Sequence, residues 1–90
     1  MSPSRTAAIE ADLQEWLCQE LAARLEIPGG RIDPAEPMSA YGLDSLRAVA
    51  VLTEVEEHVG FEIDSDVLWD HPTVADLARY LAARMDRPEP

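Results

Sequence analysis

Basic residues and cysteine are scarce in this sequence, and each shortage excludes certain functions. Seven lysine and arginine residues stand against eighteen aspartate and glutamate residues, which leaves a formal net charge of −11. A chain this acidic repels DNA, RNA and anionic lipid surfaces, so we expect no nucleic-acid or membrane partner and favour a basic protein. Cys18 is the only cysteine, which excludes an internal disulfide and a thiol-rich zinc site.

Long apolar runs are also missing. No stretch approaches the length of a membrane-spanning helix, and the first residues lack the basic patch and apolar run of a secretory signal. Together with the single cysteine, which fits a reducing compartment, this predicts a cytoplasmic protein. The 90 residues, 47% hydrophobic and 28% charged, suffice for one small globular domain with one core.

Apolar residues at helical spacing mark a first helix over residues 6–25. Its inner stripe recurs at every fourth position: Ile9, Leu13, Leu17, Leu21 and Leu25. The segment IPGG that follows ends the helix. Residues 31–43 show neither helical nor alternating spacing, so we predict a long ordered loop there. Four apolar side chains are expected to pin this loop: Ile32, Met38, Tyr41 and Leu43.

Three more helices complete the expected fold. Residues 44–59 form the second helix, which Gly60 ends, and a short third helix is capped by Asp64 or Ser65 and reaches Trp69. Thr73 caps the last helix. Its inner face is expected at Val74, Leu77, Leu81 and Met85. We therefore predict an all-α four-helix bundle with three longer helices, one short third helix and a long loop between the first two. The domain is expected over residues 6–85, between flexible tails at 1–5 and 86–90.

On a helical wheel, at about 100° per residue, the second helix separates into a core face and an outer face. The core face holds Ala48, Leu52, Val55 and Val59, with Val49 and Val51 at its flanks. The outer face holds Leu46, Arg47, Ala50, Glu54 and Glu57. Leu46 is therefore an apolar residue on the solvent side of the helix, next to Ser45.

Ser45, in the stretch GLDSL, admits three interpretations: a plain helix-start residue, a catalytic nucleophile, or a hydroxyl that another enzyme modifies. Catalysis is disfavoured, because residues 43–47 do not follow the GxSxG turn of hydrolases. His58 lies nearly four turns along the same helix, roughly 20 Å away, and cannot act as the base. His71 stays open on sequence grounds, although a histidine before proline in a turn more often forms local hydrogen bonds.

Modification by a phosphodiester suits the position of Ser45. A phosphate on the first turn of a helix faces unpaired backbone N–H groups and the positive end of the helix dipole. Gly42 allows a tight approach into the helix, and Leu43 anchors the turn. Asp44 places a carboxylate beside the modified oxygen, where it can share a metal ion, although no resident metal site is predicted.

The motif GLDSL at the start of an acidic helix, together with the later LWDHPT, resembles the acyl carrier protein family, especially polyketide synthase carriers. The resemblance covers about residues 9–85. It implies that a magnesium-dependent phosphopantetheinyl transferase attaches 4′-phosphopantetheine from coenzyme A to Ser45, and that this arm carries acyl groups as thioesters. It also implies a non-catalytic protein that serves as the substrate of other enzymes. These are an acyltransferase or an acyl or aminoacyl ligase, and a ketosynthase or other pathway enzymes with basic docking surfaces.

In that family the residues beside the modified serine form a shared docking surface. By position it maps to Asp44, Leu46, Thr53, Glu54 and Glu57, and we add Arg47 and Ala50 from the same outer face. Arg47 departs from an all-acidic surface. It either helps to select partners or pairs with a neighbouring carboxylate, and the second interpretation is favoured.

Three functions stay open on sequence grounds. The favoured one is a discrete, monomeric acyl carrier protein of polyketide or related secondary-metabolite biosynthesis, because the chain begins with Met1 and has short polar tails. The DxPT element at residues 70–73 is also common in carriers of multidomain synthases. Peptidyl or aminoacyl carriers of nonribosomal pathways typically show Gly-Gly-x-Ser where this chain has GLDS, which favours acyl cargo. The third function is an acidic helical interaction module without a prosthetic group.

Overall fold

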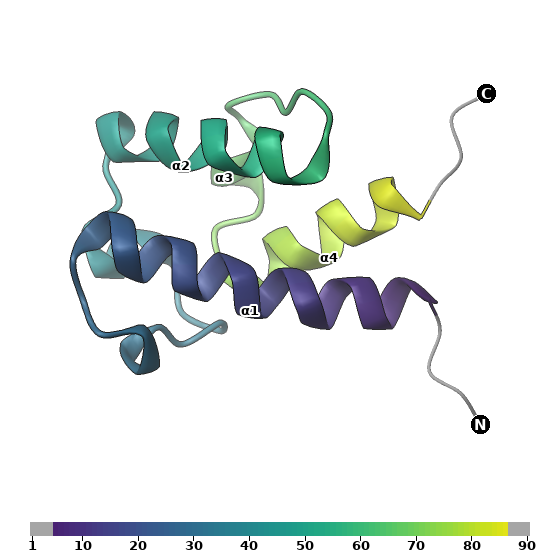
Figure 1. The fold of residues 1–90 in the computed structure, drawn as a ribbon. Helices are drawn as coiled ribbons and strands as arrows, with labels where there is room; N and C mark the ends of the chain where they lie inside the picture. Colours follow the sequence, from purple (N-terminus) through teal and green to yellow (C-terminus); the bar gives the residue numbers. More distant parts are fainter. Residues whose placement is uncertain (1–4, 87–90) are drawn as a thin grey trace.

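Four α-helices and two short 3-10 turns make up the regular structure of residues 5–86, the part of the chain that the computed structural model describes (Figure 1). In chain order they are α1 (Arg5–Leu25), η1 (Gly29–Arg31), η2 (Met38–Tyr41), α2 (Ser45–Val59), α3 (Val67–Asp70) and α4 (Val74–Met85). These residues form no strand, only an isolated bridge between Pro37 and Thr73. The predicted all-α bundle, with three longer helices and a short third one, is confirmed.

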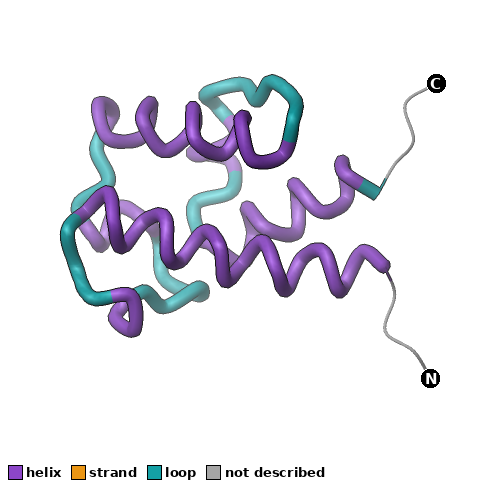
Figure 2. Tube along the Cα trace, in the orientation of Figure 1, coloured by secondary structure: helices purple, strands orange, loops and turns teal. Residues whose placement is uncertain are grey.

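The core lies between α1, α2 and α4. Figure 2 shows α1 and α4 running along each other, with α2 above them, and α1 and α4 form the most extensive helix pair. The stripe predicted for α1 faces this core, since Leu13, Leu17, Leu21 and Leu25 are buried and Ile9 is half-buried. None of the described helices is both long and apolar enough to cross a membrane.

The start of α1 and the end of α4 meet at one end of the bundle. The Thr6 hydroxyl donates a hydrogen bond to the carboxylate of Asp86, and Arg5 forms an ion pair with the same carboxylate at 3.2 Å. Arg5 is helical and Asp86 is half-buried, although both fall within the predicted flexible tails. The remaining tail residues, 1–4 and 87–90, lie outside the described part of the chain.

The first helix ends at Leu25, as predicted. The residue that leaves the helix in a left-handed conformation is Glu26, with a φ of 58°, and it precedes the IPGG segment. The next N–H group, of Ile27, donates to the Ala22 carbonyl at 3.0 Å. A bond from the second residue beyond a helix back across its last turn is the Schellman arrangement, which fixes the direction of the departing chain. Ile27 is thereby held against the end of α1.

The loop before α2 is ordered, as predicted. Ile32, Met38 and Leu43 are buried, and Tyr41 is half-buried. Two backbone hydrogen bonds tie this loop to the connection before α4 and to its first turn: the Met38 N–H donates to the Pro72 carbonyl at 2.8 Å, and the Ala75 N–H to the Pro34 carbonyl at 3.0 Å. The loop therefore positions the start of α2 from two sides.

Three predictions about individual residues are wrong. Val49 is 61% exposed, because it lies about 100° around α2 from the buried Ala48, beyond the edge of the core. Met85 is 38% exposed, because it belongs to the last turn of α4, where the bundle ends. Neither Asp64 nor Ser65 is the N-cap of α3; that position is Asp66, and the Asp64 side chain instead accepts the Asp66 N–H within the preceding turn.

Candidate functional site

The site develops from the turn that leads into α2. Gly42 adopts a left-handed conformation with a φ of 91°, which a residue with a Cβ rarely adopts. Leu43 then enters the core and is 6% exposed. Asp44 is extended and caps the helix, because its Oδ1 accepts the Arg47 N–H at 2.8 Å. Ser45 follows as the first residue of α2, and its side chain is exposed.

The electrostatics at this position favour an anion. The N–H groups in the first turn of a helix have no intrahelical acceptor, and the aligned peptide dipoles leave a partial positive charge there. Asp44 accepts only one of these N–H groups through its side chain. The hydroxyl of Ser45 thus stands at the positive end of a 15-residue helix while it is open to solvent.

A shallow groove adjoins Ser45, between α2 and the short α3. Its volume is about 220 Å³, and its lining residues are Ser45, Ala48, Val49, Leu52, Ser65, Leu68 and Trp69. Trp69 is 52% exposed, so two large apolar side chains, Val49 and Trp69, border the groove without being covered. The helical wheel could have identified Val49 as a residue at the edge of the core face. Nothing in the sequence indicates that Trp69 of α3 would face α2.

The residues predicted as a docking surface do not all face the same way. Leu46 is 81% exposed, and Thr53 and Glu57 are exposed beside it on the outward side of α2. Ala50 and Glu54, on the side toward α1, are half-buried. The Glu54 carboxylate is also engaged, because it forms an ion pair with Arg24 of α1 at 2.7 Å.

Arg47 does not pair with a neighbouring carboxylate, so the favoured interpretation of this residue is wrong. Its side chain is exposed and forms no ion pair with any residue in the described range 5–86. The guanidinium instead lies over the turn, where its Nη1 is 3.9 Å from the position that a Cβ on Gly42 would occupy. The acidic side chains on either side of Arg47 along the chain are already engaged, because Asp44 accepts the Arg47 backbone N–H and Glu54 pairs with Arg24.

Both histidines pack against aromatic rings. His58 stacks on Trp16 of α1 with ring centroids 3.9 Å apart, and His71 packs against Tyr80 at 4.7 Å. Burial, and to a smaller extent the negative charge of Asp33, raise the pKa of the Cys18 thiol. Residues 5–86 contain no group of three histidine, cysteine or acidic side chains placed to hold a metal ion.

Residues 15–81 match the family model described as the phosphopantetheine attachment site. The chain is also similar to one component of the phenolphthiocerol/phthiocerol polyketide synthase of Mycobacterium tuberculosis (strain CDC 1551 / Oshkosh), with 39% identity over 77 residues. That alignment covers 86% of this chain but 4% of the synthase component, so the chain spans only a small part of the curated relatives it matches.

Solved structures agree with the family match. A free-standing peptidyl carrier protein from an uncharacterized secondary metabolic pathway of Acinetobacter baumannii has 30% identity and a TM-score of 0.82, with 86% of this chain and 96% of that one covered. The acyl carrier protein LipD from Actinoplanes friuliensis has 34% identity and a TM-score of 0.74, with 96% of each chain covered.

Proposed function

Because this chain belongs to the phosphopantetheine-binding acyl carrier protein family, we propose that it carries acyl intermediates of polyketide or related secondary-metabolite biosynthesis as thioesters on an arm attached to Ser45. Carriers of this family bear a 4′-phosphopantetheine group and are themselves non-catalytic. The observation that supports Ser45 most strongly is its placement as an exposed hydroxyl at the positive end of α2.

The residues at the start of α2 fit this prosthetic group. When bound, the group supplies a thiol that forms thioesters. Attachment joins the Ser45 oxygen to the phosphorus next to the pantetheine of coenzyme A, breaks the pyrophosphate P–O bond and releases adenosine 3′,5′-bisphosphate. The serine proton passes to a base on the transferase, since His58 lies thirteen residues further along α2, about 20 Å away, and is stacked on Trp16.

Three residues before Ser45 have distinct tasks in this function. Gly42 makes the turn that brings the chain into α2, and Leu43 anchors that turn in the core. Asp44 holds the first helical turn through the Arg47 N–H and places a carboxylate beside the serine, where the magnesium ion of the transferase can be shared. A phosphodiester then lies against the N–H groups of the helix start.

Partner enzymes complete the function. They are a phosphopantetheinyl transferase, an acyltransferase or an acyl or aminoacyl ligase, and a ketosynthase or other pathway enzymes. We expect them to dock on the outward side of α2, through Leu46, Thr53 and Glu57, with a basic rim that matches the net charge of −11. Arg47, Ala50 and Glu54 lie toward the α1 edge of this surface. A monomeric carrier in the cytoplasm fits this role.

Intact mass after incubation with coenzyme A and a broad-specificity phosphopantetheinyl transferase tests the attachment site. The wild-type chain should gain the mass of one phosphopantetheine, and Ser45→Ala should gain none while keeping its helical circular dichroism. Ser65→Ala is the matched control, because Ser65 is an exposed serine that lines the same groove, and it should be modified as the wild type is. A normal mass gain in Ser45→Ala would falsify the site.

Two other functions are distinguished by related measurements. One alternative is that the arm carries an aminoacyl or peptidyl group, and the likeness to the Acinetobacter baumannii peptidyl carrier supports this alternative. The mass of the protein isolated from its producing cells reports the cargo directly, and an amino acid on the arm would select this alternative. If the wild-type chain gains no mass with the transferase, the chain is instead an acidic interaction module without a prosthetic group.

A further inference from the structure

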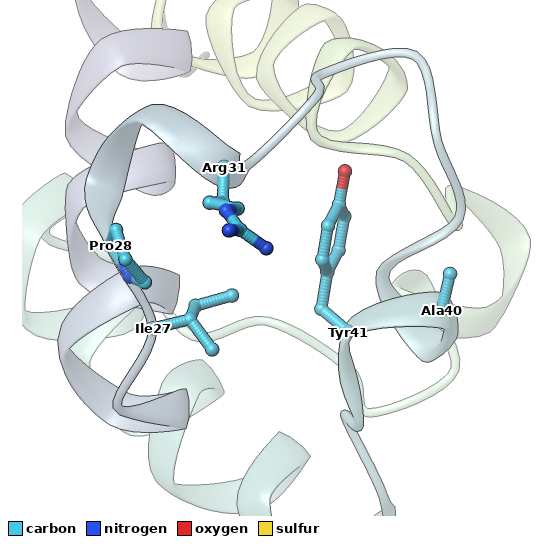
Figure 3. Close-up of a pocket in the computed structure, with 5 residues that line it drawn as sticks. All are labelled: Ile27, Pro28, Arg31, Ala40 and Tyr41. Atoms are coloured by element: carbon cyan, nitrogen blue, oxygen red, sulfur yellow. The ribbon is translucent and has the colours of Figure 1, made fainter.

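A second cavity lies on the other side of the turn that leads into α2, between η1 and η2 (Figure 3). Its volume is about 290 Å³, and it is lined by Ile27, Pro28, Arg31, Ala40 and Tyr41. Figure 3 shows Arg31 and Ile27 on one side of the pocket and Tyr41 across from them. The cavity is close to twice the size of the roughly 150 Å³ apolar cavity that holds benzene, so it can hold a short acyl group.

The walls of this cavity are fixed by hydrogen bonds of the chain itself. The Schellman bond from the Ile27 N–H holds Ile27, and the Arg31 N–H donates to the Pro28 carbonyl at 3.0 Å. Opposite them, the Tyr41 hydroxyl oxygen accepts the Asp33 N–H at 2.7 Å, which leaves its own proton free for donation. The cavity is therefore preformed, and a ligand entering it need not order the surrounding loop.

Arg31 gives the cavity its chemical character. The chain contains no lysine, and its basic residues are all arginine. Among the described ones, Arg5, Arg24 and Arg79 form ion pairs, and Arg84 lies over the ring of Phe61 at 4.2 Å. Arg31 and Arg47 form neither kind of contact within residues 5–86. An exposed, unpaired guanidinium at the mouth of an apolar cavity matches a ligand with an apolar body and a terminal carboxylate.

The occupant should be attached to the chain rather than free. A net charge of −11 repels free anions, so a small carboxylate in solution would bind weakly. A group on an arm at Ser45 is held at a high effective concentration, which offsets this repulsion. Tyr41 is four residues before Ser45, and four residues span at most about 14 Å between Cα atoms, so the cavity lies within reach of a long arm.

We propose that this cavity holds acyl cargo that ends in a free carboxylate, with Arg31 pairing with the carboxylate and Ile27 and Tyr41 enclosing the methylene groups. This inference depends on the proposed attachment of the arm at Ser45. The groove between α2 and α3 suits neutral cargo instead, because its lining residues include no cationic side chain, only two serine hydroxyls, the Trp69 indole and aliphatic groups. A carboxylate there would lose hydration without gaining a cationic partner.

The test compares two arms that differ only in charge at the tip. The transferase loads the chain from glutaryl-coenzyme A or from 5-methylhexanoyl-coenzyme A, in which an isopropyl group replaces the carboxylate, and intact mass verifies each loading. The ¹H–¹⁵N NMR spectra of the two loaded proteins should then differ at Ile27, Arg31, Ala40 and Tyr41. Carbon-13-labelled glutaryl methylenes should also show nuclear Overhauser contacts to the Tyr41 ring. Both signals should vanish in Arg31→Gln and persist in Arg79→Gln, which removes the same charge from α4.

Each of the other outcomes contradicts a different part of the proposal. If neither thioester loads onto the wild-type chain, the attachment at Ser45 fails, and this inference fails with it. If both load but the glutaryl group contacts Val49 and Trp69, or contacts no residue of the cavity, the cavity is not its site while the carrier function stands. Signals that survive in Arg31→Gln would show that the guanidinium does not recognise the carboxylate.

Discussion

Leu46 is exposed far beyond what folding requires. At 81% exposure it lies beside Ser45 on the outward side of α2, whereas Leu17 of α1 is fully buried. A single exposed leucine is ordinary on a protein surface and contributes little to stability, but its position next to the proposed attachment site favours a role in binding. An apolar contact at the centre of an otherwise charged interface is also the usual arrangement of a transient complex.

We therefore expect Leu46→Ala to reduce kcat/KM for modification by the transferase while leaving stability within about 0.5 kcal/mol of the wild type. Leu17→Ala is the contrasting variant, since loss of a buried leucine destabilises by about 2–5 kcal/mol. Initial rates of mass gain give the first quantity, and urea unfolding followed by circular dichroism gives the second. A loss of stability in Leu46→Ala comparable to that in Leu17→Ala would show that the side chain packs in the fold.

Cys18 should be a poor nucleophile. Burial, followed by the charge of Asp33, raises the pKa of its thiol, so less thiolate is present near neutral pH than for an exposed cysteine. After attachment of the arm, a disulfide reagent such as Ellman's reagent should react quickly with the added thiol and slowly with Cys18. A fast first phase in unmodified protein would contradict the burial of Cys18.

The raised pKa of Cys18 also determines how the unfolding free energy changes with pH. The folded protein binds the thiol proton more tightly than the unfolded chain, so this contribution to stability is complete below the unfolded pKa and is lost as pH rises through the folded pKa. The unfolding free energy of the wild type should therefore decline more steeply in alkaline solution than that of Cys18→Ala.

At the scale of single elements, Asp44 serves both the helix and the site. Its side chain accepts the Arg47 N–H at the start of α2, as Thr73 accepts the Asp76 N–H at the start of α4. Asp44→Ala should destabilise the protein by about 1 kcal/mol, as Thr73→Ala should, since each removes an N-cap. Asp44→Asn keeps a capping oxygen but removes the charge, so it should keep most of the stability.

Modification rates separate the two roles of Asp44. If the carboxylate assists the transferase, Asp44→Asn should be modified much more slowly than the wild type although its stability is nearly unchanged. Thr73→Ala, which loses a cap remote from Ser45 in sequence, should be modified at the normal rate. Equal modification rates for the wild type and Asp44→Asn would leave Asp44 as a helix cap only.

The elements themselves could be predicted because their signals are local. The cap Thr73, the ending residue Gly60 and the stripe of α1 act within a few residues, and each is found where the sequence indicates it. GLDSL likewise identifies the start of α2 and the exposed hydroxyl. The 3-10 turns at η1 and η2 have no such signal, because a single turn does not establish a period.

What could not be predicted depends on how elements meet. Arg47 forms no ion pair within residues 5–86, whereas Arg24 of α1 pairs with Glu54 of α2. Trp69 borders the groove only because α3 sits beside α2, and Val49 stays exposed because it faces this groove and not the core. The cavity behind Tyr41 requires the end of α1 and the loop to face each other across a gap. None of these relations is visible in one helix.

In the whole molecule, the place where the first and last helices meet is separated from the start of α2. The first residue of α1 and the end of α4 leave the bundle together, whereas the start of α2, with Ser45, lies at the opposite end in Figure 1. The proposed attachment site at Ser45 therefore lies at the end of the bundle away from the Arg5–Asp86 ion pair.

The net charge of −11 should make salt act in opposite directions on folding and on docking. Between about 0.1 M and about 1 M salt the Debye length shrinks from about 10 Å to about 3 Å, which screens both the repulsion within the folded chain and the attraction to a basic partner. Tm should therefore rise with salt, while kcat/KM for modification should fall.

The transferase has its own sensitivity to salt. The decisive quantity is therefore the difference in the salt dependence of kcat/KM between two matched variants. Glu57 is exposed and forms no ion pair within residues 5–86, so Glu57→Gln should flatten the dependence of kcat/KM on salt. Glu54→Gln removes the same charge, but Glu54 is half-buried and already neutralised by Arg24, so its salt dependence should stay close to that of the wild type. Equal slopes for the two variants would mean that partners sense the total charge of the molecule, and that the outward side of α2 has no special part in their approach.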